Sequence, residues 1–137
     1  MAKTAVQKSE KPEFKRAFSS FSVDDLDKAK EFYGDLLGLD VDVTGEGLNL
    51  DIDGQGVFIY PKDDHKPATF TVLNLLVEDI AKTVEQMKDL GIEFESYSGE
   101  METDENNIMW GEKHEGGGPN IAWFKDPAGN FVSVIQE

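Results

Sequence analysis

Apolar and polar positions alternate in short runs along this chain, and twice they change to a helical spacing. Residues 14–23 read as a strand, because Phe, Ser and Val alternate loosely there. The apolar stripe that follows, from Leu26 to Leu37, predicts a helix that begins at the Asp24-Asp25 pair and ends at Gly38. Three more strands are expected before Pro61, over residues 39–43, 48–52 and 57–60.

The second half of the chain repeats this order. Residues 70–77 read as a strand, and a helix follows with its apolar stripe on Ile80, Val84, Met87 and Leu90 and its end at Gly91. Further strands are expected over residues 92–97, 120–125 and 131–135, with a strand start at 108–110. Val77-Glu78-Asp79-Ile80 matches Val23-Asp24-Asp25-Leu26, so the same strand-to-helix turn occurs in both halves.

We therefore predict an α+β fold of two tandem βαβββ modules, which form a curved mixed sheet with a half-open cleft and helices on the outer face. Residues 1–13 are expected to be a tail and 14–137 a single domain, with module one over 14–61 and module two over 69–137. Strand alternation turns one set of side chains toward the helices. That expected core set is Phe21, Val23, Leu73, Leu75, Val132 and Val134.

Composition excludes several classes of function. The net charge is -15, from 13 basic and 28 acidic residues, so a nucleic-acid partner is not expected. Such a charge favours a cationic ligand, although acidic surfaces more often serve solubility. The absence of cysteine excludes disulfides and thiol catalysis. No apolar run reaches the roughly 18 residues of a membrane helix and the N-terminus lacks a signal core, so a cytoplasmic protein without membrane contact is expected.

Two motifs carry a resemblance to a known family. One runs from Val23-Asp24-Asp25-Leu26 through Glu31-Phe32-Tyr33 to Leu36-Leu37-Gly38-Leu39, and the other is Phe124-Lys125-Asp126-Pro127-Ala128-Gly129-Asn130. Together they resemble the vicinal oxygen chelate superfamily, which contains glyoxalases, extradiol dioxygenases and fosfomycin- and bleomycin-type resistance proteins. The resemblance covers the chain from about residue 14 to the C-terminus. We read the Asp-Pro-Ala-Gly-Asn segment itself as a structural turn.

The resemblance also implies four positions for metal ligands in metal-dependent members. They correspond here to Phe18, Val72, Ser133 and a position on the strand 57–60, which holds no carboxylate or imidazole. A divalent metal needs oxygen or imidazole ligands that converge on one point. We therefore expect no metal site and no cofactor, and the metal-centred mechanisms of the family are in doubt for this chain.

A small-molecule cleft is the favoured site. Alternation places one set of side chains toward it, and aromatic groups with a few hydroxyl and amide groups suit a flat aromatic or cationic ligand. The expected ligand-binding residues are Phe18, Ser20, Tyr60, Val72, Asn74, Trp110 and Ser133. Trp123 and Phe21 are read as core.

Two other readings stay open. His114 and Glu112, in a glycine-rich loop, are candidate acid–base residues for a lyase or isomerase, and a metal enzyme with relocated ligands would draw on His65, Glu112 and His114. His65, in a polar linker, is otherwise expected to serve the surface. We predict a small-molecule-binding homodimer, whose modules either pair within one chain or exchange between two chains.

Overall fold

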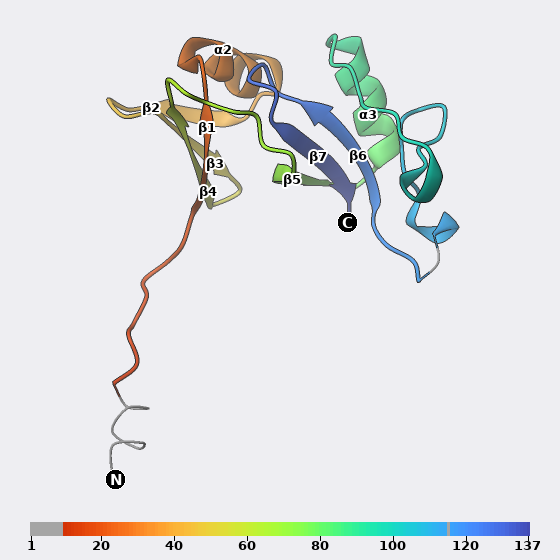
Figure 1. Ribbon diagram of the computed structural model, residues 1–137, viewed down its shortest axis with the longest axis horizontal. Coiled ribbons are helices and arrows are strands. Elements are labelled where there is room, and N and C mark those ends of the chain that lie inside the picture. Colours follow the sequence, from red (N-terminus) through yellow and green to blue (C-terminus); the bar gives the residue numbers. More distant parts are fainter. Residues whose placement is uncertain (1–9, 115) are drawn as a thin grey trace.

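Each half of the chain builds one sheet in the computed structural model, which describes residues 10–114 and 116–137 (Figure 1). The first sheet has the order β1-β4-β3-β2, with β1 at Ser19–Val23, β2 at Asp40–Val43, β3 at Leu48–Ile52 and β4 at Gln55–Pro61. The second has the order β5-β7-β6, with β5 at Thr71–Val77, β6 at Asn120–Lys125 and β7 at Phe131–Gln136. In each sheet the first strand of the module pairs in parallel with its last strand. The predicted α+β fold of two repeated modules is confirmed.

The two helices begin at equivalent caps. Helix α2 (Leu26–Lys30) follows Asp25, whose carboxylate accepts the Lys28 N–H at 3.1 Å, and α3 (Ile80–Asp89) follows Asp79, which accepts the Lys82 N–H at 3.2 Å. Both aspartates are extended, with φ of -140° and -135°. The two strand-to-helix turns are therefore copies in geometry as well as in sequence. No helix in residues 10–114 and 116–137 is long and apolar enough to cross a membrane.

The first helix changes pitch after one turn. Residues Glu31–Leu36 form a π-helical segment, η1, and beyond it the Leu39 N–H donates to the Tyr33 carbonyl at 3.0 Å. An apolar stripe is compatible with an α-helix and with a π-helical segment, so the sequence pattern could not show this change and predicted one regular helix. Two short 3-10 turns, η2 (Gly99–Met101) and η3 (Gly111–Lys113), lie in the long connection between α3 and β6.

One core joins the two modules on the side of the sheets that carries α2, η1 and α3. The expected alternation is confirmed: Phe21, Val23, Val132 and Val134 are buried, and Leu73 and Leu75 pack against the same cluster. The η1 segment reaches across to the second sheet, where the rings of Phe32 and Phe124 lie 6.0 Å apart.

Three expected strand segments differ from the structure. Residues 14–18 are not part of β1, and the Phe14 side chain is 86% exposed. Residues 92–97 make a single bridge, from Phe94 to Phe124, and the Asn107 side-chain amide also donates to the carbonyls of Phe94 and Glu95 at 3.3 Å each. Residues 108–110 likewise contribute one bridge, from Met109 to Ile121. Both segments therefore contribute isolated bridges to β6 in place of the expected strands.

The strands β1 and β5 each stand at the end of their sheet. Each has one neighbour, β4 and β7 respectively, and its other edge has no strand beside it in the described part of the chain. The two modules thus present two separate open faces, and each ends at an unpaired edge.

Candidate functional site

The open face of the first sheet carries an aromatic surface. Phe58 and Tyr60 alternate along β4 on the side turned away from the buried Val57 and Ile59, and their rings stack at 6.2 Å with 19° between the planes. Ser20 pairs with Phe58 in register, and Phe18, 60% exposed, borders a hollow of about 440 Å³ beside Phe58. Three expected ligand-binding residues, Phe18, Ser20 and Tyr60, therefore belong to one face.

The open face of the second sheet carries a polar pair among apolar side chains. Asn74 on β5 is opposite Ser133 on β7, and the Ser133 hydroxyl donates to Asn74 Oδ1 at 2.5 Å. Ser133 is fully buried although its neighbour Asn74 is exposed. The third expected residue of this sheet, Val72, lies at an irregularity in the β5 register and packs against the core.

Trp110 belongs to neither open face. Its indole N–H donates to Asp104 Oδ2 at 2.8 Å, and its ring packs against the core. Burial on its own would raise the pKa of Asp104, but hydrogen bonds from the Ile108 N–H, the Trp110 indole and the Asn106 N–H, together with the Lys113 charge, lower this pKa. Asp104 thus organises the loop before β6.

The candidate acid–base residues lie in another region. His114, partly buried, lines a polar hollow of about 480 Å³ together with Gly99, Glu100, Glu102 and Lys113, and Glu112 is exposed. Figure 1 shows the η3 segment beyond β6, which is the edge strand of the second sheet opposite β5. The structure therefore separates His114 and Glu112 from the pair of Asn74 and Ser133.

His65, which was expected to serve the surface, is part-buried and belongs to the contact between the modules. Its Nδ1 lies 2.7 Å from the Ser22 hydroxyl, and its Nε2 lies 3.0 Å from the Ala128 carbonyl. Because a carbonyl can only accept, Nε2 carries the hydrogen and Nδ1 accepts from Ser22. The imidazole is held by a strand of module one and a turn of module two.

The turn at Asp126 to Asn130 also connects the modules, which the sequence did not reveal. The buried Tyr33 hydroxyl donates to Asp126 Oδ2 at 2.8 Å, and Asn130 Nδ2 donates to the Ser22 carbonyl at 2.9 Å. Burial raises the pKa of Tyr33, and the Asp126 charge and hydrogen bond raise it further. The available signal was a tyrosine at a buried position of a helical stripe, since a buried hydroxyl needs a partner.

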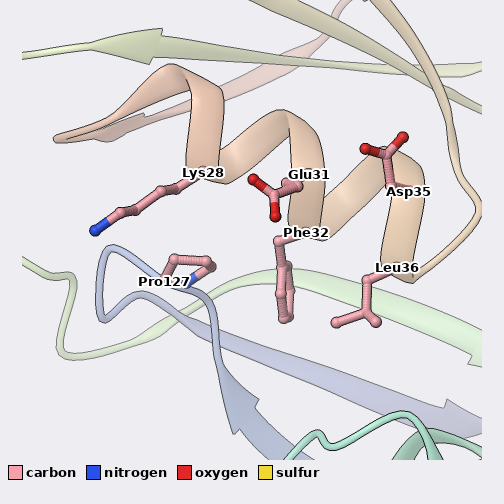
Figure 2. A pocket seen from close by; sticks show the side chains of 6 residues that line it. All are labelled: Lys28, Glu31, Phe32, Asp35, Leu36 and Pro127. Atoms are coloured by element: carbon pink, nitrogen blue, oxygen red, sulfur yellow. The ribbon is translucent and has the colours of Figure 1, made fainter.

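A further pocket, of about 370 Å³, lies along the first helix (Figure 2). Phe32 and Leu36 point from the helix toward the strands beneath it, Glu31 and Asp35 stand near the helix, and Lys28 extends toward the turn that holds Pro127. The sequence placed Phe32 and Leu36 on the apolar stripe of the helix and gave no sign of this pocket. It lies on the helix side of the sheets, away from both open faces.

The positions at which the family resemblance implies metal ligands do not fit a metal ion. They hold the hydrocarbon side chains of Phe18 and Val72 and the Ser133 hydroxyl, which is committed to Asn74. Among residues 10–114 and 116–137, no three histidine, aspartate or glutamate side chains gather closely enough to hold an ion. We therefore derive no reaction step through a metal.

Solved structures of several known proteins share this fold. The bleomycin-binding protein in its complex with bleomycin has a TM-score of 0.64 and 24% identity, covering 90% of this chain and 99% of that one. The fosfomycin resistance protein FosX from Listeria monocytogenes has a TM-score of 0.64 and 15% identity, covering 92% and 95%. Lactoylglutathione lyase from Agrobacterium tumefaciens has a TM-score of 0.57 and 22% identity, covering 88% and 92%. These likenesses establish the fold.

No curated protein sequence matches the chain. A family model, however, matches residues 17–134, which is most of its length and includes both modules. The protein therefore belongs to the Glyoxalase/Bleomycin resistance protein/Dioxygenase superfamily.

Proposed function

We propose that this protein binds a small organic molecule between open sheet faces without using a bound metal ion. The single observation that carries the proposal is the Ser133–Asn74 hydrogen bond at 2.5 Å. Ser133 stands at a position where a metal ligand would be needed, and its hydroxyl is already bound to the Asn74 side chain. The stacked Phe58 and Tyr60 supply an aromatic wall for a flat ligand. The bleomycin-binding protein, which shares the fold, holds bleomycin in its complex, and this supports a binding role for the present chain.

We also propose that the functional unit is a homodimer whose two copies complete each site. The aromatic wall belongs to the first sheet and the polar pair to the second, and the sheets end at the unpaired edges of β1 and β5. Pairing β1 of one copy with β5 of another would place an aromatic wall beside a polar pair and close both edges. Sedimentation equilibrium is expected to give about twice the chain mass of 15.2 kDa.

The binding test is a panel of aromatic and aromatic-cationic compounds measured by calorimetry, with metal content determined by mass spectrometry on natively purified protein. Tyr60→Ala is expected to weaken binding about tenfold, because it removes half of the stacked aromatic pair. Glu31→Gln, in the helix-side pocket, is the matched control and should leave binding unchanged. Stoichiometric metal, or a loss of binding in Glu31→Gln alone, would contradict the proposed site.

Mixing two defective variants tests whether the site is shared between copies. Tyr60→Ala lies on the first sheet and Asn74→Leu on the second, so each variant homodimer has two damaged sites. If two copies build each site, the mixed dimer has one intact site and regains half of the binding capacity. If no binding capacity is recovered after subunit exchange, each chain builds its site alone.

Acid–base catalysis is the second candidate function, and the polar hollow around His114 favours it. A partly buried imidazole beside Glu100, Glu102 and Lys113 has the groups needed for proton transfer. The test is turnover of the methylglyoxal–glutathione adduct by the wild type and by His114→Ala. Product formation that His114→Ala abolishes would establish this function, whereas saturable binding without product would favour the binding protein.

A further inference from the structure

The centre of the second open face is a row of three side chains from three strands. Asn74 on β5 pairs with Ser133 on β7, and Ser133 pairs with Trp123 on β6. Residues in register on neighbouring strands place their side chains on the same face. Apolar residues flank this row: Leu76 is two positions from Asn74, Ile135 two from Ser133, and Ile121 two from Trp123. Only Asn74 of this row is exposed, because Ser133 is fully buried and Trp123 is 9% exposed.

Ser133 determines how the Asn74 amide is turned. Its hydroxyl is fully buried, and among the described residues its one hydrogen-bond partner is Asn74 Oδ1. An amide oxygen can only accept, so Ser133 donates. Rotating the amide by half a turn would bring Nδ2 to Ser133 and leave the buried hydroxyl hydrogen without an acceptor. The amide oxygen is therefore held toward Ser133, and Nδ2 is turned away from it.

Nδ2 is consequently a donor available to a ligand. It makes no hydrogen bond with any residue in 10–114 or 116–137, and Asn74 is exposed. Trp123, at the other end of the row, is only 9% exposed, and its ring packs edge-on against Tyr97 at 5.5 Å. Lys125, two positions farther along β6, adds an ammonium group whose contact with Glu95 is as long as 3.9 Å. The exposed donor beside Ser133 is therefore Asn74 Nδ2, whereas the Lys125 ammonium group lies beside the Glu95 carboxylate.

We infer that Ser133 orients the Asn74 amide as a fixed donor, so the site takes a ligand that presents a carbonyl or similar acceptor oxygen attached to an apolar body. The inference rests on the proposed small-molecule function and adds to it the chemical class of the ligand. Ser133 acts through Asn74 and is a positioning residue. Asn74 makes the contact, and the apolar body of the bound ligand, packed against Leu76 and Ile135, would shield it from water, which strengthens the hydrogen bond.

Two probes of the same shape test this inference. 2-Acetylnaphthalene carries an acceptor oxygen where 2-ethylnaphthalene carries a methylene group, and both are uncharged, so the net charge of the protein does not bias the comparison. The wild type is expected to bind the ketone about tenfold more tightly than the hydrocarbon, as one hydrogen bond in a dry site would give. The measurement is the ratio of the two dissociation constants, obtained by fluorescence titration.

Asn74→Asp is the decisive variant. Its carboxylate still accepts from Ser133 but offers no donor, so the ketone preference should fall from about tenfold to none or reverse. Ser133→Ala frees the amide to rotate and should reduce the preference, and Ser133→Thr should restore it. Glu31→Gln, in the pocket on the helix side of the sheets, is the control that leaves the ratio unchanged.

The outcomes separate this inference from the proposed function. If both probes bind and Tyr60→Ala weakens both equally, but the ratio in the wild type is close to one or is unchanged in Asn74→Asp, the inference is overturned and the proposed function stands. If neither probe binds the wild type, the proposed function fails and the inference fails with it. A preference lost in Asn74→Asp and recovered in Ser133→Thr supports both.

Discussion

At the scale of single residues, the Tyr33 hydroxyl connects the first helix to a turn more than ninety positions away in the chain. Its partner Asp126 also accepts from the backbone N–H groups of Ala128 and Asn130, at 3.0 and 2.8 Å. This carboxylate therefore fixes its own turn with one oxygen and receives the Tyr33 hydroxyl with the other. The motif that resembles the family's final turn is consequently also part of the contact between the modules.

Tyr33→Phe is expected to lower the free energy of unfolding by about 1–3 kcal/mol, because it removes a buried hydrogen bond and leaves an acceptor with fewer donors. Urea denaturation followed by circular dichroism measures the change. Tyr60→Phe is the matched control: its hydroxyl bonds to no residue of the described segments, so the change should stay within about 0.5 kcal/mol. If Tyr33→Phe and Tyr60→Phe changed the free energy of unfolding equally, the structural role assigned to the Tyr33–Asp126 hydrogen bond would be contradicted.

Asp104 gives the protein a stability that depends on pH. Because its folded-state pKa is lowered, its contribution is fully present above the unfolded-state pKa and is lost as the pH falls through the folded value. Asp104→Asn should therefore destabilise the protein at pH 7, and the difference from the wild type should shrink below about pH 4. Chemical denaturation at a series of pH values measures this difference.

Glu105→Gln is the control for Asp104, since Glu105 is the exposed neighbour of Asp104. Its effect should be small at every pH. A difference between Asp104→Asn and the wild type that stays constant from pH 7 to pH 3 would contradict the role of the Asp104 charge.

At the scale of elements, the two helices depend on their aspartate caps. Asp25 and Asp79 each satisfy an N–H of the first helical turn that has no partner within the helix. The second helix is the more regular one and buries Ile80, Val84 and Met87 against the second sheet. Loss of the Asp79 cap should therefore destabilise the packing of α3 in the core of module two.

Asp25→Ala and Asp79→Ala are each expected to lower the free energy of unfolding by about 1 kcal/mol, the usual cost of losing an N-cap. Thermal and urea unfolding measure the effect. Asp89→Ala, at the other end of α3, is the control and should be neutral or slightly stabilising, because a negative charge is unfavourable near a helix C-terminus. A destabilisation by Asp89→Ala as large as that by Asp79→Ala would contradict this explanation.

The sequence predicted elements well where local chemistry determines them and poorly where distant side chains do. Caps, glycine stops and alternation place α3, β3 and β6 correctly. The segment 92–97 has a strand-like sequence but makes one bridge only, and its contact with the Asn107 amide, more than ten positions away, leaves no local pattern. For the same reason the sequence could name Asn74 and Ser133 as site residues but could not show that one orients the other.

At the scale of the whole molecule, the two modules share one core and three polar contacts through Tyr33, His65 and Asn130. The chain should therefore unfold as one unit. Both tryptophans, Trp110 and Trp123, lie in module two, so their fluorescence reports on that module, whereas circular dichroism reports on both. We expect the two urea transitions to coincide. A separate transition in circular dichroism would show that module one unfolds independently.

The unpaired edges of β1 and β5 also affect how this protein behaves at high concentration. A free strand edge is a template that any extended peptide can join, and it does not distinguish a correct partner from a misfolded neighbour. The net charge of -15 supplies a repulsion that only a well-matched surface overcomes. Acidification or concentrated salt weakens this repulsion while the edges stay the same, so the concentrated protein should then form fibrous or amorphous deposits.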